Sequence, residues 1–183
     1  MDIAVIVGSL REGSFNRKVA RALKLLAPPG LALREVGIGA LPLYNQDLDN
    51  DPPAQWVTFR DAIRPADGLL FVTPEYNRSV PGVLKNAIDI GSRPPGKSVW
   101  GGKPGAIVSA TPGPLGAFGS NHHLRQSCVA LDIPLLQQPE VYLAGVKDEM
   151  FAGDGAVTDE RVKKLLTRFI GAYAAWVGRF AGD

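Results

Sequence analysis

The sequence predicts a three-layer α/β fold in which a doubly wound, parallel, five-stranded sheet lies between two layers of helices. Several short runs of strand length are apolar almost throughout, which is typical of strands buried on both faces of a parallel sheet. Stretches with helical periodicity separate these runs, so strand and helix alternate five times along the 183 residues. The expected strands are residues 3–7, 31–36, 68–73, 105–110 and 133–136, and the expected helices are residues 14–26, 53–63, 81–90, 116–131 and 158–180.

Prolines and capping residues predict where these helices begin and end. The first helix is expected to stop before Pro28 and Pro29. The third is expected to take Pro81 as its first residue, where a missing N–H costs nothing. The last is expected to have Thr158 as its N-cap, although Arg161 stands three residues later, where a capping box has Glu or Gln.

Composition indicates one globular domain over residues 1–183 without a metal centre. Hydrophobic residues make up 45% and charged residues 21%, and 20 basic against 18 acidic residues leave a net charge of +2, too small to indicate a nucleic-acid surface. Cys128 is the only cysteine, and His122 and His123 are adjacent, so no metal cluster is expected. The first apolar run ends at Gly8 without a basic leader or a span-length segment, so we expect a cytoplasmic protein that does not enter a membrane.

The turn after the first predicted strand has the composition of a phosphate site. A helix follows this turn, and a helix N-terminus offers free backbone N–H groups and a partial positive charge. Ser9, Ser14 and Asn16 add neutral donors, and Arg11 adds a planar cation. This set matches one phosphomonoester dianion.

The sequence of this turn does not match two other known nucleotide-binding motifs. A dinucleotide fingerprint needs a second glycine where the chain has Leu10. Gly8 and Gly13 have the spacing of a P-loop, but Ser14 stands where that loop has its lysine. The remaining alternative is an ordinary strand-to-helix turn with Ser14 as the N-cap.

The loop after the predicted strand 68–73 is suited to a flat ring. Pro74 and Pro81 stiffen its ends, Tyr76 supplies a flat face, and Asn77 supplies both a donor and an acceptor. Glu75 is either a proton donor or a structural or subunit-contact residue. The alternative is that this loop only connects the strand to the next helix and binds no ligand.

A third Gly/Pro turn, residues 109–116, follows the fourth strand. The expected strand order is 2-1-3-4-5, and ligands of such sheets bind at the carboxyl ends of the strands, at the switch point. The three turns are therefore expected to converge there on one ligand.

The residues also resemble a known family. Residues 8–11 with 14–16, and residues 74–77 with 79–89, resemble the NADPH-dependent FMN reductase family, and within it the bacterial chromate and quinone reductases. The resemblance extends to about Val141 and implies a flavodoxin-like fold, non-covalent FMN, and a homodimer or homotetramer with the flavin near a subunit interface. It implies that FMN contacts Ser9, Arg11, Ser14, Phe15 and Asn16 around its phosphate, Pro74, Glu75, Tyr76 and Asn77 along the ring, and the stretch from Ser109 to Gly113 at the other edge.

The resemblance further implies a ping-pong reaction in which NADPH or NADH passes hydride to flavin N5 and a small acceptor then takes the electrons. The acceptor could be a quinone, free flavin, chromate or an azo or nitro compound. No catalytic side chain is expected, because the flavin carries the chemistry. Arg17, Arg78 and Arg93 are candidates for contacting an NADPH 2′-phosphate. Residues 41–47 are expected either at the mouth of the cleft or in a subunit contact.

Three other functions remain as alternatives. A flavodoxin-type electron carrier without its own NAD(P)H chemistry is usually strongly acidic, which disagrees with a net charge of +2. A P-loop-like hydrolase and a protein that has lost its cofactor are the others.

Overall fold

The computed structural model describes residues 1–180 and contains one parallel sheet of five strands in the order β2-β1-β3-β4-β5. The predicted architecture and strand order are confirmed. The strands are β1 (Asp2–Val7), β2 (Ala32–Glu35), β3 (Gly68–Thr73), β4 (Gly105–Ala110) and β5 (Val141–Leu143). The helices are α1 (Phe15–Leu26), α2 (Ala54–Ile63), α3 (Gly82–Gly91), α4 (Phe118–Ala130) and α5 (Glu160–Gly178), with short 3-10 turns η1 (Gln46–Leu48) and η2 (Asp148–Met150).

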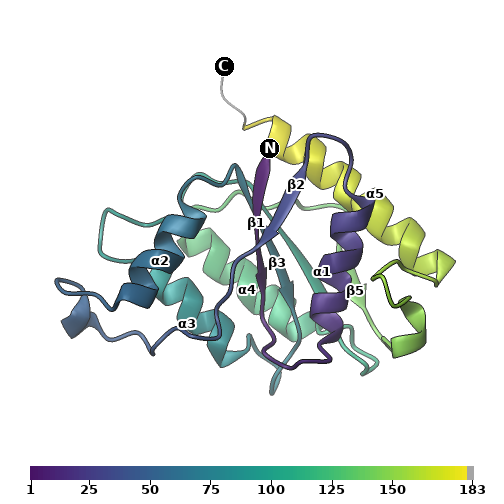
Figure 1. Ribbon diagram of the computed structural model, residues 1–183, viewed down its shortest axis with the longest axis horizontal. Coiled ribbons are helices and arrows are strands. Elements are labelled where there is room, and N and C mark those ends of the chain that lie inside the picture. The colour runs from purple at the N-terminus through teal and green to yellow at the C-terminus, as the bar shows by residue number, and fades with distance from the viewer. Residues whose placement is uncertain (181–183) are drawn as a thin grey trace.

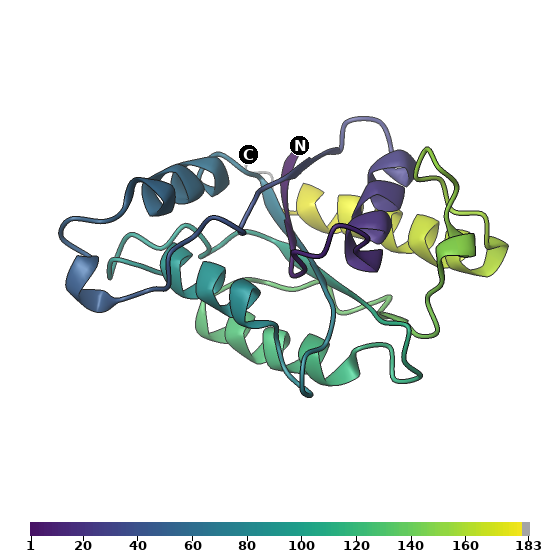
Figure 2. The same ribbon diagram turned by 60° about the horizontal axis from the view of Figure 1, so that its bottom comes forward.

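Helices cover both faces of the sheet, with α1 and α5 on one side and α2, α3 and α4 on the other (Figures 1 and 2). Successive side chains of a strand point to opposite faces, and β1 shows the result. Ile3 and Val5 pack in the core under α1 and α5, whereas Ala4 and Ile6 pack in the core under the other three helices. Both faces are buried, which explains why the strand sequences are apolar without alternation.

Two close contacts hold the helices to the sheet. Tyr173 of α5 is fully buried, and its hydroxyl donates to the backbone oxygen of Leu69 at 2.8 Å. Trp100 packs against Gly91 at the end of α3, where an added Cβ would lie 2.4 Å from the indole ring. The indole Nε1 donates to the backbone oxygen of Ile88 at 3.0 Å.

The fifth predicted strand, residues 133–136, is wrong in its bounds. Leu135 forms only an isolated bridge to Gly105, and the ladder to the end of β4 is made by Val141–Leu143. Pro134 and Pro139 lack the N–H that a continuous ladder requires. The apolar run therefore lies beside the start of β4, and regular pairing resumes after the second proline.

Each of the five helices begins one or two residues later than predicted, and three of these starts are informative. Pro81 is the N-cap of α3 and lies outside the helix. The N-cap of α5 is Asp159, which accepts from the backbone N–H of Val162 at 2.9 Å, while the Thr158 hydroxyl donates to the backbone oxygen of Glu149. The start of α4 lies two residues later than expected because Gly116 and Ala117 have positive φ angles of 60° and 59°. Within residues 1–180, no helix has the length and apolar character needed to cross a bilayer.

Candidate functional site

The carboxyl ends of β1, β3 and β4 lie toward the lower edge of the molecule in Figure 1. A cleft of about 220 Å³ opens at these strand ends. The structure brings eight of the predicted site residues together around it and leaves Asn77, Ser109 and Gly113 outside its lining. The lining consists of Ser9, Arg11, Ser14, Phe15, Asn16, Pro74, Glu75, Tyr76, Ala110, Thr111 and Pro112.

The start of α1 is built around Ser14. Its side chain caps the helix by accepting from the backbone N–H of Arg17 at 3.2 Å, which leaves its own hydroxyl hydrogen available for another acceptor. The Arg17 guanidinium pairs with Glu35 at 3.1 Å and also donates to the backbone oxygens of Arg11 and Ser9. Arg17 therefore supports the loop, and this commitment disfavours it as a partner for a 2′-phosphate.

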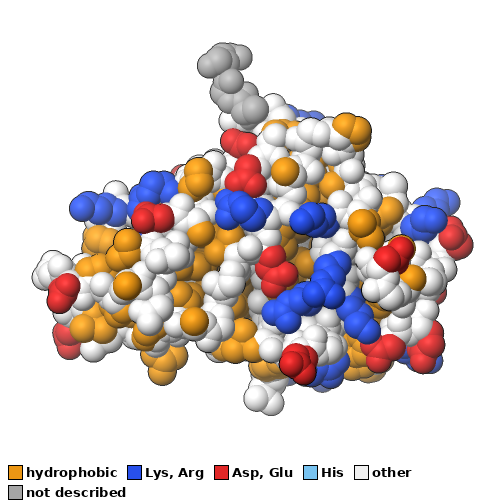
Figure 3. All heavy atoms as spheres, in the orientation of Figure 1, with side chains coloured by type: hydrophobic (Ala, Val, Ile, Leu, Met, Phe, Trp, Pro, Cys, Tyr) orange, Lys and Arg blue, Asp and Glu red, His pale blue; other side chains and the backbone are white. Residues whose placement is uncertain are grey.

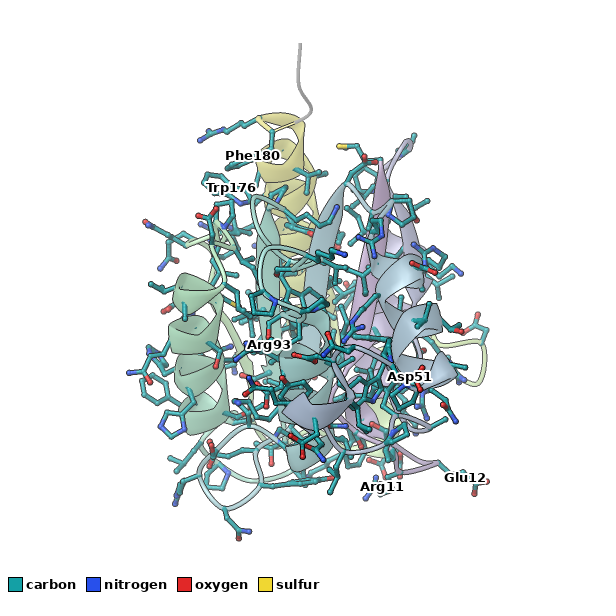
Figure 4. All side chains as sticks on the ribbon, turned by 90° about the vertical axis from the view of Figure 1, so that its left-hand side faces the viewer. Arg11, Glu12, Asp51, Arg93, Trp176 and Phe180 are labelled. Atoms are coloured by element: carbon teal, nitrogen blue, oxygen red, sulfur yellow. The ribbon has the colours of Figure 1, made fainter. Side chains whose placement is uncertain are left out.

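Arg11 supplies a positive charge beside this helix end. It is exposed, its Nη2 donates to the backbone oxygen of Gly13 at 2.5 Å, and its guanidinium carbon lies 5.1 Å from the centre of the Phe15 ring. Figure 4 shows Arg11 at the lower edge of the molecule, and Figure 3 shows Lys and Arg side chains gathered over α1. A cation next to an open helix N-terminus makes this end of the cleft favourable for an anion.

Asn16 links two of the loops and leaves one buried acceptor. Its side chain is 3% exposed, and its Nδ2 donates to the backbone oxygen of Ala110 at 3.0 Å. Its Oδ1 is buried and has no hydrogen-bond partner within the described residues. Because an unpaired buried acceptor is costly, a ligand hydroxyl group at this position would stabilise the site.

The loop between β3 and α3 turns sharply at Asn77 and Arg78. Tyr76 and Ser79 exchange backbone hydrogen bonds of 3.1 and 3.0 Å, and both residues between them have positive φ. This is the geometry of a type I′ hairpin turn. The turn uses Asn77 for its backbone conformation and keeps it out of the cleft lining, whereas Tyr76 is 51% exposed and lines the cleft.

Glu75 fastens this loop to α4. Its side chain is 11% exposed, one carboxylate oxygen accepts from the backbone N–H of Ser120 at 3.2 Å, and the other pairs with Arg78 at 3.2 Å. At Gly119 an added Cβ would lie 2.8 Å from the backbone oxygen of Arg78, so the loop and the helix start are in close contact. These contacts favour a structural role for Glu75 over a role as proton donor. The pairing with Glu75 also disfavours Arg78 as a partner for a 2′-phosphate.

Ser109 and Gly113 support the third loop without lining the cleft. Ser109 is fully buried, and its hydroxyl donates to the backbone oxygen of Gly116 at 2.7 Å. The Gly113 N–H donates to the Thr111 hydroxyl at 3.2 Å. Ala110, Thr111 and Pro112 line the cleft in their place. The alternation of side chains along a strand could have predicted this difference, because it turns Ser109 and Ala110 to opposite faces at the end of β4.

The lining fits FMN by its chemistry. Ser9, Arg11, Ser14 and the helix N-terminus form the donor set that a phosphomonoester needs, and the unpaired Asn16 Oδ1 matches a ribityl hydroxyl. Gly8 lies behind the cleft, where an added Cβ would lie 3.0–3.4 Å from Leu84, Thr73 and Pro74, so this position accepts no larger residue without rearrangement.

Residues 1–148 match the sequence profile of the NADPH-dependent FMN reductases. The chain is 57% identical over 176 residues to a quinone reductase of Pseudomonas putida, with 96% of this chain and 94% of that protein covered. It is 51% identical over 177 residues to a 2-hydroxy-1,4-benzoquinone reductase of a Burkholderia species, with 97% and 96% covered. The chain belongs to the NADPH-dependent FMN reductase family. A solved structure of FerB, a flavoenzyme NAD(P)H:(acceptor) oxidoreductase from Paracoccus denitrificans, is similar over 98% of both chains, with 40% identity and a TM-score of 0.93.

As a member of the NADPH-dependent FMN reductase family, the protein is an oxidoreductase with FMN as its cofactor and NAD(P)H as its electron donor. The expected flavodoxin-like fold and enzyme class are therefore confirmed.

Proposed function

We propose that this FMN reductase family member transfers electrons from NAD(P)H to quinones, with the FMN phosphate at the start of α1. One observation carries the assignment of the site: the cleft joins an open helix N-terminus, two hydroxyl donors and Arg11 to the exposed ring of Tyr76. An anionic tail and a flat ring would thus lie side by side.

The side chains of the cleft hold and orient the ligands. Ser9, Ser14 and Arg11 would hold the phosphate, Asn16 Oδ1 would accept from a ribityl hydroxyl, and Pro74 and Tyr76 would form the wall beside the ring. When bound, FMN supplies the hydride-transfer chemistry, so the protein needs no side-chain nucleophile.

Quinone is the proposed acceptor class because the cleft can admit a flat molecule next to Tyr76 and because relatives at 51–57% identity are named quinone reductases. An electron carrier without its own NAD(P)H chemistry is disfavoured by the same relatives and by the net charge of +2. Since the reaction draws on NAD(P)H, we place it in the cytoplasm, and we treat residues 1–183 as one domain.

We also propose a homodimer or homotetramer, supported by exposed aromatic residues beside the cleft. Phe118 at the start of α4 is 52% exposed, and its ring centre lies 4.1 Å from that of His122. Tyr142 lies 5.4 Å from Phe118 on the same surface, and Leu115 nearby is 53% exposed. Analytical ultracentrifugation tests this proposal, and a monomer at every concentration contradicts it.

The phosphate assignment is tested by Arg11→Ala. Losing a charge-assisted contact of about 1–3 kcal/mol raises the FMN dissociation constant about 5- to 150-fold. Arg21→Ala is the matched control, because Arg21 is an exposed arginine of the same helix that does not line the cleft. Titration of apo-protein with FMN gives both constants, and an unchanged constant for Arg11→Ala removes Arg11 from the site.

The acceptor is tested with the FMN-loaded protein. NADPH or NADH oxidation should accelerate when a benzoquinone is added and should slow in Arg11→Ala unless FMN is supplied in excess. If the loaded protein oxidises NAD(P)H only with one-electron protein acceptors, the quinone assignment is wrong.

A further inference from the structure

A second polar cavity lies between α2 and the segments before it and after α3. Its volume is about 280 Å³. Pro52, Val57 and Pro94 contribute apolar wall. Its charged lining comprises four cations and two carboxylates, namely Arg60, Arg64, Arg93, Lys97, Asp49 and Asp61.

This cavity is separate from the FMN cleft. The ten residues of α3 span about 15 Å, with the loop of Tyr76 before the helix and Arg93 after it. Figure 4 shows Arg93 at mid-height on the face of α2 and α3, whereas Arg11 lies at the lower edge. The two cavities share no lining residue.

Arg60 is the unusual residue of this cavity. It is 5% exposed, its Nε donates to the backbone oxygen of Ile90 at 3.0 Å, and its guanidinium carbon lies 5.7 Å from the centre of a Trp56 ring. Its Nη2 is buried and finds no hydrogen-bond partner anywhere in residues 1–180. A buried guanidinium with an unused donor is costly unless something accepts from it.

Asp49 also lines this cavity, and it has an acceptor without a hydrogen-bond partner. One of its carboxylate oxygens accepts from the Tyr44 hydroxyl at 3.2 Å. The other, Oδ1, is buried and lacks a hydrogen-bond partner in the described part of the chain. Arg60 and Asp49 both line the cavity, so its lining residues include one donor and one acceptor that have no partner among residues 1–180.

The remaining charges favour an anion. Arg64 is engaged with Asp61 at 3.5 Å, and both side chains are more than half exposed. Arg93 lies over the Tyr44 ring at 6.0 Å, and Lys97 is exposed at the rim. After the Arg64–Asp61 pair is set aside, three cations face one carboxylate.

We propose that this cavity binds a small organic phosphomonoester that carries a hydroxyl group. Phosphate oxygens would accept from Arg60 and attract Arg93 and Lys97, and the hydroxyl would donate to Asp49 Oδ1. A cavity of about 280 Å³ has room for a small phosphate ester.

The test uses FMN-loaded protein, so that the phosphate end of the other cleft is already filled. Isothermal titration calorimetry with glycerol 3-phosphate should give saturable 1:1 binding. Sulfate cannot donate a hydrogen bond to Asp49, so it should bind about tenfold more weakly or not at all. Absence of saturable glycerol 3-phosphate binding up to about 10 mM overturns the proposal.

Variants locate the binding. Arg60→Met should weaken it more than about tenfold, and the double variant Arg93→Ala/Lys97→Ala, at positions that are not buried, should weaken it about fivefold without endangering the fold. Arg179→Ala is the control, because Arg179 lies 5.7 Å over the Trp176 ring, outside this cavity. If the double variant binds as the parent does, or if Arg179→Ala weakens binding equally, the site is not here.

Asp49→Asn separates a phosphate ester from a simple anion. The amide can donate as well as accept, so sulfate binding should improve and the preference for glycerol 3-phosphate should fall at least threefold. An unchanged preference contradicts the proposed contact with Asp49.

Discussion

Ser14 is expected to have two separable roles, in the stability of α1 and in FMN binding. Its side chain caps the helix by accepting from the backbone N–H of Arg17 at 3.2 Å, and its hydroxyl lines the cleft, where its hydrogen is available to a phosphate oxygen. Alanine removes both functions. Glycine also removes the hydroxyl, but at an N-cap it costs only a few tenths of a kcal/mol, against about 1 kcal/mol for alanine.

The expected magnitudes follow from these roles. For a domain of 183 residues, 1 kcal/mol corresponds to a decrease in Tm of about 2–4 °C, so apo Ser14→Ala should melt that much lower and apo Ser14→Gly should melt within about 1 °C of the parent. Both variants lose one hydrogen bond to a charged phosphate, about 1.5–3 kcal/mol, so both should raise the FMN dissociation constant about 10- to 150-fold.

Differential scanning calorimetry of the apo-proteins and FMN titration measure the two effects. Asp159→Ala is the control, because Asp159 caps α5 in the same way, and its loss should lower the Tm without altering FMN affinity. Parent-like FMN affinity in Ser14→Gly refutes the phosphate contact. Equal melting temperatures for Ser14→Ala and Ser14→Gly refute the capping argument.

Three further predictions concern the core. Tyr173→Phe removes a buried hydrogen bond to Leu69 and should lower stability by about 1 kcal/mol in urea denaturation, with no loss expected if the hydroxyl contributes nothing. Gly91→Ala places a Cβ 2.4 Å from the Trp100 ring and should cost about 1–3 kcal/mol, and a parent-like denaturation midpoint would contradict this packing. Burial raises the pKa of the Cys128 thiol to about 12, so at about pH 8 the thiol stays protonated and a thiol reagent should label it only after unfolding.

The apolar strands were predictable because residues buried on both faces leave a continuous apolar pattern in β1, β3 and β4. The edge of the sheet was less predictable. The apolar character of residues 133–136 correctly indicates burial, but two prolines determine which residues can form a ladder. Likewise, Thr158 and Asp159 are both good N-caps, and only the tertiary contact of Thr158 with Glu149 decides between them.

The sequence predicted which loops form the cleft, but not every side chain that lines it. The polar residues before and at the start of α1 converge as expected because they sit on one helix end. Ser109 was misplaced because its hydroxyl is needed inside, at the backbone oxygen of Gly116. Arg60 gave no signal at all in the sequence, since an arginine on an amphipathic helix is ordinarily solvated and only the packing of α2 against α3 buries it.

The carboxylate of Glu75 has a consequence for how the cofactor is oriented. Two helices that begin at this edge of the sheet, α1 and α4, direct positive dipole ends toward the same opening. At α4 the partial positive charge of the helix N-terminus is already compensated by the Glu75 carboxylate, which accepts from the Ser120 N–H. An incoming dianion is therefore drawn to α1 in preference to α4, so the polarity of the opening dictates which end of an asymmetric molecule enters on which side.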